Sequence, residues 1–152
     1  MKIYLDTCCY CRPFDLQRQT QTKVETEAVF VESIIELCKI FGFDILGSVI
    51  LATEIKRICN IEKRRNVLTF YKSTINERAK LSADVVNRAQ EINAQGIKAF
   101  DAYHIALAET AQVDYLLTVD EKLERTAEKL TLTLKVINPL MFLPEVSKWA
   151  QT

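Results

Sequence analysis

The sequence has little glycine and proline and no long hydrophobic run. Three glycines, three prolines and 49% hydrophobic residues are typical of a compact chain rich in helices, and exclude a disordered one. The longest apolar stretches, residues 115–119 and 140–143, are far shorter than the roughly 20 residues of a membrane helix. Asp6 stands where the apolar region of a signal peptide would still be running. We therefore expect a single domain over residues 1–152 that stays in the cytoplasm, away from membranes.

The sequence also lacks an excess of charge of either sign. Twenty basic and 20 acidic residues give a formal net charge of +0, so any nucleic acid must be bound by a local basic patch. The cysteines number 5, which is odd, and three of them crowd residues 8–11, so a disulfide framework is not expected. These three have no fourth ligand at zinc spacing, which disfavours a structural zinc site. We expect reduced thiols that pack.

Further absences exclude some kinds of phosphate chemistry. The chain has no glycine-rich loop that could cradle a nucleotide phosphate. Asp6 has no second aspartate two positions later. An aspartyl-phosphate intermediate is therefore disfavoured.

Strand-like and helix-like segments alternate along the chain. Short apolar runs predict strands at residues 2–6, 43–46, 114–119 and 134–137. Apolar residues at intervals of three and four predict helices at residues 22–41, after Ser48, and at about 62–74, 82–95, 99–111 and 121–130. Residues 7–14 are predicted as a polar, proline-containing loop. The alternation predicts a three-layer α/β/α sandwich with a central parallel sheet of four to five strands.

Acidic residues follow two of the predicted strands directly. Asp6 closes the first strand and Asp120 closes the third. Ligands of such sheets bind in the crevice at the carboxyl ends of the strands, so both side chains are expected there. Asp101, in the first turn of its helix, and Glu54, in the helix after the second strand, could reach the same crevice.

Four carboxylates in one crevice would repel one another unless a cation neutralised them. Oxygen ligands without thiolate or histidine favour Mg²⁺ or Mn²⁺ over zinc. Such sites activate water for hydrolysis of a phosphodiester. The residues predicted as both metal ligands and catalytic groups are Asp6, Glu54, Asp101 and Asp120.

Each of these acids also has a simpler interpretation. Asp6 and Asp120 could each be only the N-cap of the following helix, and the helix dipole alone favours Asp101 in a first turn. Most glutamates on surface helices, Glu54 included, would be solvated. The competing candidates on the preceding helix are Glu25, Glu27 and Glu32.

The residues around the acids resemble the PIN domain family. The resemblance rests on Leu5-Asp6-Thr7, on Ser48 followed by Glu54, and on the segments GIKAFDAYHIALAE (96–109) and LLTVD (116–120), in this order and spacing. It covers about residues 2–143. It implies a parallel sheet flanked by helices and a metal-dependent ribonuclease that uses the four acids above.

The resemblance has further implications for the site and for partners. It implies that Thr7 and Thr118 are polar groups supporting the ligands, and that homodimers are frequent. Many members of the family are toxins neutralised by a cognate antitoxin protein. The segment from Cys8 to Phe14 departs from the asparagine- or serine-containing turn that usually follows the first aspartate, and this bears on RNA selection.

Two other features adjoin the predicted site. His104, the only histidine, falls three residues after Asp101 and on the same helix face. A partly buried packing residue is its simpler interpretation, and proton transfer beside the acids is the alternative. Basic residues near the acids form either a solvated face or a grip on an RNA backbone. The candidates for that grip are Arg12, Lys56 and Arg57, with Lys63, Arg64 and Arg65 beyond them.

Together these features predict an endoribonuclease that hydrolyses single-stranded RNA with a metal-activated water. Two alternatives stay open at this point. One is a non-catalytic PIN-like module that binds RNA or protein. The other is a small-molecule phosphohydrolase on a similar open sheet.

Overall fold

A computed structural model describes residues 1–151 and has one all-parallel sheet at its centre. The sheet has five strands in the order β3-β2-β1-β4-β5. Their bounds are β1 Lys2–Leu5, β2 Asp44–Gly47, β3 Glu77–Arg78, β4 Tyr115–Leu117 and β5 Lys135–Ile137.

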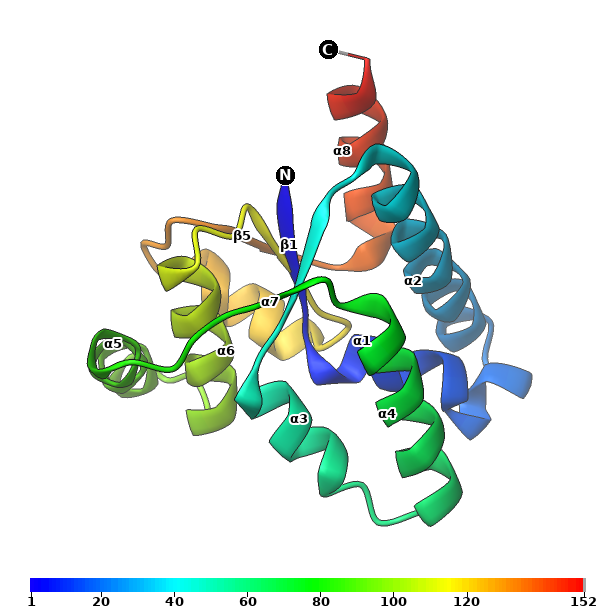
Figure 1. Ribbon diagram of the computed structural model, residues 1–152, viewed down its shortest axis with the longest axis horizontal. Helices are drawn as coiled ribbons and strands as arrows, with labels where there is room; N and C mark the ends of the chain where they lie inside the picture. The colour runs from blue at the N-terminus through cyan, green and yellow to red at the C-terminus, as the bar shows by residue number, and fades with distance from the viewer. Residues whose placement is uncertain (152) are drawn as a thin grey trace.

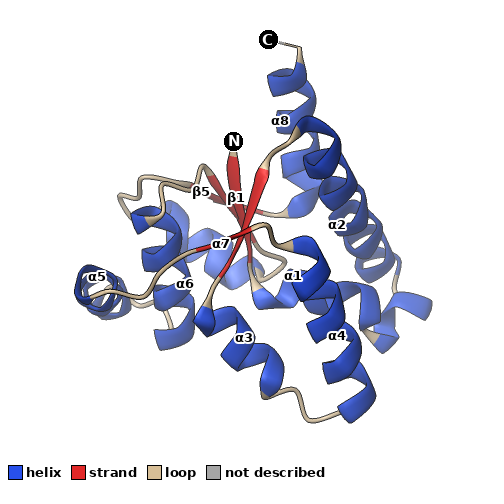
Figure 2. Ribbon diagram, viewed as in Figure 1, coloured by secondary structure: helices blue, strands red, loops and turns tan. Residues whose placement is uncertain are grey.

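Helices cover both faces of this sheet. Their bounds are α1 Thr7–Cys11, α2 Thr22–Phe41, α3 Val49–Lys56, α4 Ile61–Thr74, α5 Ala83–Ala94, α6 Ala99–Thr110, α7 Glu121–Glu128 and α8 Pro139–Ala150, with short 3₁₀ helices at Arg12–Phe14 and Leu16–Gln19. Helices α5 and α6 lie on one side of the strands, and α2, α4 and α8 lie on the other (Figure 1). Figure 2 shows the strands enclosed between these two sets of helices. The predicted three-layer α/β/α fold is confirmed.

Strands β1 and β4 lie in the interior of the sheet and are apolar, because helices cover both of their faces. Ile3, Tyr4 and Leu5 of β1 are fully buried, as are Leu116 and Leu117 of β4. In the parallel register Tyr4 lies beside Leu116 and Leu5 beside Leu117. Near-continuous apolar runs are expected of strands buried on both faces.

Successive strands are added on one side of β1 first and on its other side afterwards, and this change of side marks the place where a ligand is expected. The chain passes from β1 to β2 on one side of β1, and later returns to β4 on the other side. The peptide N–H of Asp6 donates to the carbonyl of Leu117 at 2.9 Å, so the carboxyl ends of β1 and β4 are joined side by side. Open α/β sheets bind ligands at such a reversal point.

The prediction of a loop at residues 7–14 is wrong. Residues 7–11 form α1, which begins because the Asp6 side chain accepts a hydrogen bond from the Thr7 N–H. Cys9 and Tyr10 are fully buried, which stabilises this short helix by packing. Pro13 lies in the first turn of the following 3₁₀ helix, where its missing N–H leaves no bond unmade.

The strand β3 and the helix α8 were also not predicted. The strand β3 has 2 residues and pairs in parallel with β2, which is too short a run to show a hydrophobic period. Helix α8 contains Pro144, a residue that argues against a helix interior, but Asn138 caps it and Pro139 fits its first turn. Among residues 1–151, no helix has both the length and the apolar character needed to cross a bilayer.

Candidate metal centre

A hollow at the carboxyl edge of the sheet gathers acidic side chains from separate elements. Its lining consists of Asp6, Thr7, Cys8, Cys11, Arg12, Asp15, Glu54, Asp101 and Asp120. The acids that the sequence singles out therefore face one space, although they come from the end of β1, from α3, from α6 and from the start of α7.

Asp6 is an N-cap and a member of the hollow at the same time. It is 5% exposed, and its Oδ1 accepts from the Thr7 N–H at 2.7 Å. Its Oδ2 accepts from the hydroxyl of Thr118 at 3.0 Å and from the thiol of Cys8 at 3.4 Å. These bonds fix the carboxylate of Asp6 in one orientation at the edge of the hollow.

Asp120 is likewise both the N-cap of a helix and part of the lining of the hollow. Its Oδ1 accepts from the N–H groups of Lys122 and Leu123 at 3.0 and 3.1 Å, which starts α7. The N–H of Asp120 donates to the Thr118 hydroxyl at 3.1 Å. Because that hydroxyl also donates to Asp6, Thr118 connects the two acids by hydrogen bonds.

His104 is more than the partly buried packing residue of the simpler interpretation. It is fully buried, and its Nε2 contacts the carboxylate of Glu54 and lies 3.6 Å from Oδ1 of Asp6. The hydroxyl of Thr7 donates to the same Glu54 oxygen at 2.7 Å. Glu54 is therefore held from two sides, by α6 and by α1.

The contact between His104 and Glu54 favours the charged forms of both groups. Burial acts to lower the pKa of His104, but the bond to Glu54 and the charge of Asp6 outweigh it and raise the pKa above its usual value. Burial acts to raise the pKa of Glu54, but the bond and charge of His104 outweigh it and lower the pKa. The two pKa shifts are opposite in sign, and each favours the charged form, so they describe a partly buried ion pair at the base of the hollow.

A hydrogen-bonded chain continues behind His104 into the core. Its Nδ1 lies 2.6 Å from the hydroxyl of Tyr4, which lies 2.7 Å from the hydroxyl of Ser48. Ser48 caps α3 by accepting from the Leu51 N–H at 3.1 Å. The cap of α3 and the imidazole that holds Glu54 are thus part of one network. Tyr4 was not a predicted site residue. The only feature of the sequence that could have indicated it is a hydroxyl group among the apolar residues of the first strand.

Negative charge in the hollow exceeds what the surrounding groups neutralise. Burial, followed by the charge of Asp6, raises the pKa of Asp101 to about 6. The charges of Asp120 and Glu54 act in the same direction. A buried carboxylate that is surrounded by other carboxylates is a natural ligand for a cation.

The donor atoms fit a hard divalent cation. Asp6, Glu54 and His104 place two carboxylate oxygens and a ring nitrogen within 4.8 Å of one another. The protonated His104 that pairs with Glu54 has no free lone pair at this nitrogen, so the carboxylates are the ligands open to an ion. Asp101 and Asp120 lie outside this compact group but line the same hollow, so most donors on offer are carboxylate oxygens. Oxygen donors suit Mg²⁺ or Mn²⁺ better than zinc.

The predicted basic residues occupy different positions around the site. Arg12 lines the hollow, and its guanidinium pairs with Glu27 and Asp15, both at 3.0 Å. Lys56 and Arg57 are exposed at the end of α3, where the Arg57 guanidinium lies 5.2 Å from the ring centre of Phe100.

Glu27, a competing candidate for the site, has another function in the fold. It is fully buried, accepts from Arg12, and accepts from the amide of Asn138 at 2.8 Å. Its ion pair with Arg12 therefore helps to keep the Arg12 guanidinium beside the hollow. Its place on the buried face of α2, three residues after Val24 and one before Ala28, is the signal that marks it as inward-facing.

Comparison with known proteins agrees with this geometry. A model of the PIN domain family matches residues 3–129, which is well over half of the chain. No curated protein matches the chain significantly. The matched segment includes the strand-end aspartates, the helix that carries Glu54 and the helix that carries Asp101 and His104. The chain therefore belongs to the PIN domain family.

Proposed function

We propose that the protein is a metal-dependent endoribonuclease that hydrolyses phosphodiester bonds of single-stranded RNA, with Mg²⁺ or Mn²⁺ as its ion. The observation that carries the proposal is the convergence of Asp6, Glu54, Asp101 and Asp120 on one hollow at the reversal point of the sheet. Membership of the PIN domain family supports a nuclease.

Each acid has a distinct place in this proposal. Asp6, Asp101 and Asp120 hold the ion, directly or through water, and Thr118 keeps the first and the last of them in register. Glu54, held by His104 and Thr7, orients the attacking water or completes a second ion position. When bound, the ion supplies an activated water and stabilises negative charge on the phosphodiester.

The test is cleavage of labelled single-stranded RNA with Mg²⁺ or Mn²⁺ and with EDTA. We expect cleavage that the chelator abolishes and that Asp6→Asn and Asp101→Asn each remove while the variants stay folded. Asp84→Asn is the matched control, because Asp84 is an exposed acid in the first turn of α5 and lies outside the hollow.

Other results would point to the two alternatives. RNA binding without cleavage would indicate a non-catalytic binding module. Hydrolysis of generic phosphate esters with RNA left intact would indicate a small-molecule phosphohydrolase. Cleavage that persists in EDTA would exclude the metal mechanism.

A toxin role within this function would have two observable properties. Expression of the protein would arrest growth, and Asp6→Asn would relieve the arrest. A small protein encoded beside it would restore growth and bind the wild-type chain. Normal growth during expression of a protein that cleaves RNA in vitro would argue for a stand-alone nuclease.

A further inference from the structure

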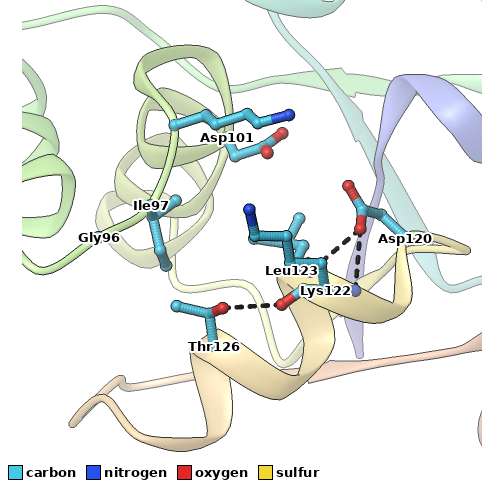
Figure 3. A pocket seen from close by; sticks show the side chains of 8 residues that line it. Gly96, Ile97, Asp101, Asp120, Lys122, Leu123 and Thr126 are labelled. Atoms are coloured by element: carbon cyan, nitrogen blue, oxygen red, sulfur yellow. Dashed lines mark hydrogen bonds between the residues drawn. The ribbon is translucent and has the colours of Figure 1, made fainter.

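A second hollow adjoins the acidic one at two shared carboxylates. Its lining consists of Gly96, Ile97, Lys98, Asp101, Asp120, Lys122, Leu123 and Thr126. Asp101 and Asp120 line both hollows, so the two spaces meet at these side chains. The second hollow lies between the start of α6 and the first turns of α7 (Figure 3).

The two sides of this second hollow each supply one lysine. Lys98 directly precedes α6, and Lys122 is in the first turn of α7. Figure 3 shows the Lys122 side chain extending from α7 into the space below Asp101. Buried apolar side chains lie beneath, since Ile97 is 3% exposed and Leu123 is 4% exposed.

The ammonium groups of these lysines are not used by the fold. Both residues are exposed, and within residues 1–151 neither side chain makes a hydrogen bond or an ion pair of 4.0 Å or less. The cation that lines the acidic hollow is already paired, because Arg12 contacts Glu27 and Asp15, and Lys63 pairs with the same Asp15 at 2.7 Å. Lys98 and Lys122 therefore keep their full capacity to bind an external anion.

From this arrangement we propose that Lys98 and Lys122 form a subsite for the backbone phosphate next to the one that is cleaved. The inference rests on the proposed function. It identifies the path that the RNA strand takes beside the four acids. A phosphate held between the lysines lies beside Asp101 and Asp120, so the neighbouring phosphate of the same strand reaches the ion that these two carboxylates hold.

The subsite also resolves an electrostatic difficulty. The acidic hollow repels a polyanion wherever the ion does not neutralise it. Two ammonium groups immediately beside it attract the backbone without contacting the bases, so the subsite positions the strand and selects no sequence.

The experiment measures RNA binding in an Asp6→Asn background, so that affinity is read without cleavage. A labelled single-stranded RNA is titrated at several salt concentrations against Lys98→Ala, Lys122→Ala and the double variant. Lys129→Ala is the control. Lys129 is an exposed lysine at the C-terminal end of α7, the helix whose first turn carries Lys122, and it lies outside both hollows. Lys98→Arg and Lys122→Arg test whether a cation alone restores binding.

We expect each alanine variant to bind about threefold to tenfold more weakly at low salt, and to reduce the slope of log affinity against log salt by about 0.7 to 1. Lys129→Ala should leave both quantities unchanged, and the arginine variants should restore them. A scan that replaces one phosphate at a time by an uncharged methylphosphonate should find one linkage, adjacent to the cleaved one, that weakens binding to the parent protein and has no effect on the double variant.

The outcomes separate this subsite from the proposed function. If Lys98→Ala and Lys122→Ala match Lys129→Ala while wild-type protein cleaves RNA, the subsite is wrong and the nuclease stands. If the lysines determine binding and no metal-dependent cleavage occurs, the subsite stands and the nuclease is wrong. Absence of any RNA binding overturns both.

Discussion

The imidazole of His104 contacts the carboxylate of Glu54 at the buried base of the acidic hollow. Its other ring nitrogen faces the hydroxyl of Tyr4, so the ring cannot turn without breaking a buried contact on one side. The orientation of Glu54 in the hollow therefore depends on a side chain that is itself shielded from solvent.

Removal of His104 should weaken metal binding and cleavage together. We expect His104→Ala to lower Mn²⁺ affinity and cleavage rate by about 10- to 100-fold, the usual effect of losing a residue that orients a metal ligand. Calorimetry and single-turnover cleavage measure the two quantities. His104→Gln, which can still donate to Glu54, should recover part of the loss, and Tyr4→Phe should have a smaller effect. Wild-type affinity in a folded His104→Ala protein would contradict this role.

Neutralising Asp101 should stabilise the metal-free protein. The pKa of Asp101 is raised from its ordinary 3.8 to about 6, so the folded protein holds the proton more tightly than the unfolded chain. Stability is then lost as pH rises from about 4 to about 6, and Asp101→Asn should avoid that loss at neutral pH. After allowance for solvent screening the gain is on the order of 1 kcal/mol, or about 2 to 4 °C in Tm.

Addition of metal should reverse this order. Mg²⁺ or Mn²⁺ stabilises whichever protein binds it, so the Tm of the wild type should rise and that of Asp101→Asn should change little. Thermal melts in EDTA and in excess metal measure both effects. A lower Tm for Asp101→Asn in EDTA would show that its charge is already neutralised within the fold.

Loss of Glu27 should destabilise the fold far more than loss of a neighbouring glutamate. Glu27 is fully buried against Arg12, and removing one partner of a buried pair costs about 3 to 5 kcal/mol. Glu25 on the same helix makes a solvent-exposed pair with Arg18, and Glu25→Ala should cost about 0 to 1 kcal/mol. Urea unfolding of Glu27→Ala and Glu25→Ala compares the two. Equal losses would mean that Arg12 finds full compensation in Asp15.

Gly47 should not tolerate even a methyl group. A Cβ at this position would lie 2.5 Å from both the Tyr71 hydroxyl and Cδ1 of Ile75. The Tyr71 hydroxyl accepts from the Ser48 N–H at 3.0 Å, so its displacement disturbs the start of α3. We expect Gly47→Ala to cost about 1 to 3 kcal/mol in urea unfolding.

The sequence predicts elements and residues whose information is local. Helix α2 was bounded correctly because its apolar period is regular and Gly42, with a φ of 69°, ends it in the left-handed conformation. Asp6 and Asp120 could be placed at one edge because Asp6 directly follows β1, only two residues separate Asp120 from the end of β4, and parallel strands share the direction of their carboxyl ends.

Features that depend on tertiary contact could not be predicted in this way. The helix α1 exists because Tyr10 and Cys9 are buried, and nothing in a run of cysteines before a proline indicates that burial. The pairing of His104 with Glu54 joins residues 50 positions apart, and neither the spacing nor the residue types identify the partner. Burial of Glu27 is a similar case, although its position on the apolar face of α2 was a usable signal.

The order of the acids along the chain sets when the site can first exist during synthesis. The hydroxyl of Thr118 bonds Asp6 across 112 positions, and β4 must already be paired with β1 for that bond to form. A nascent chain that has left the ribosome only as far as α5 carries Asp6 and Glu54 but neither of the other two acids. Under the proposed function, an unfinished chain of this length would lack two of its four acids and could not yet cleave its own messenger.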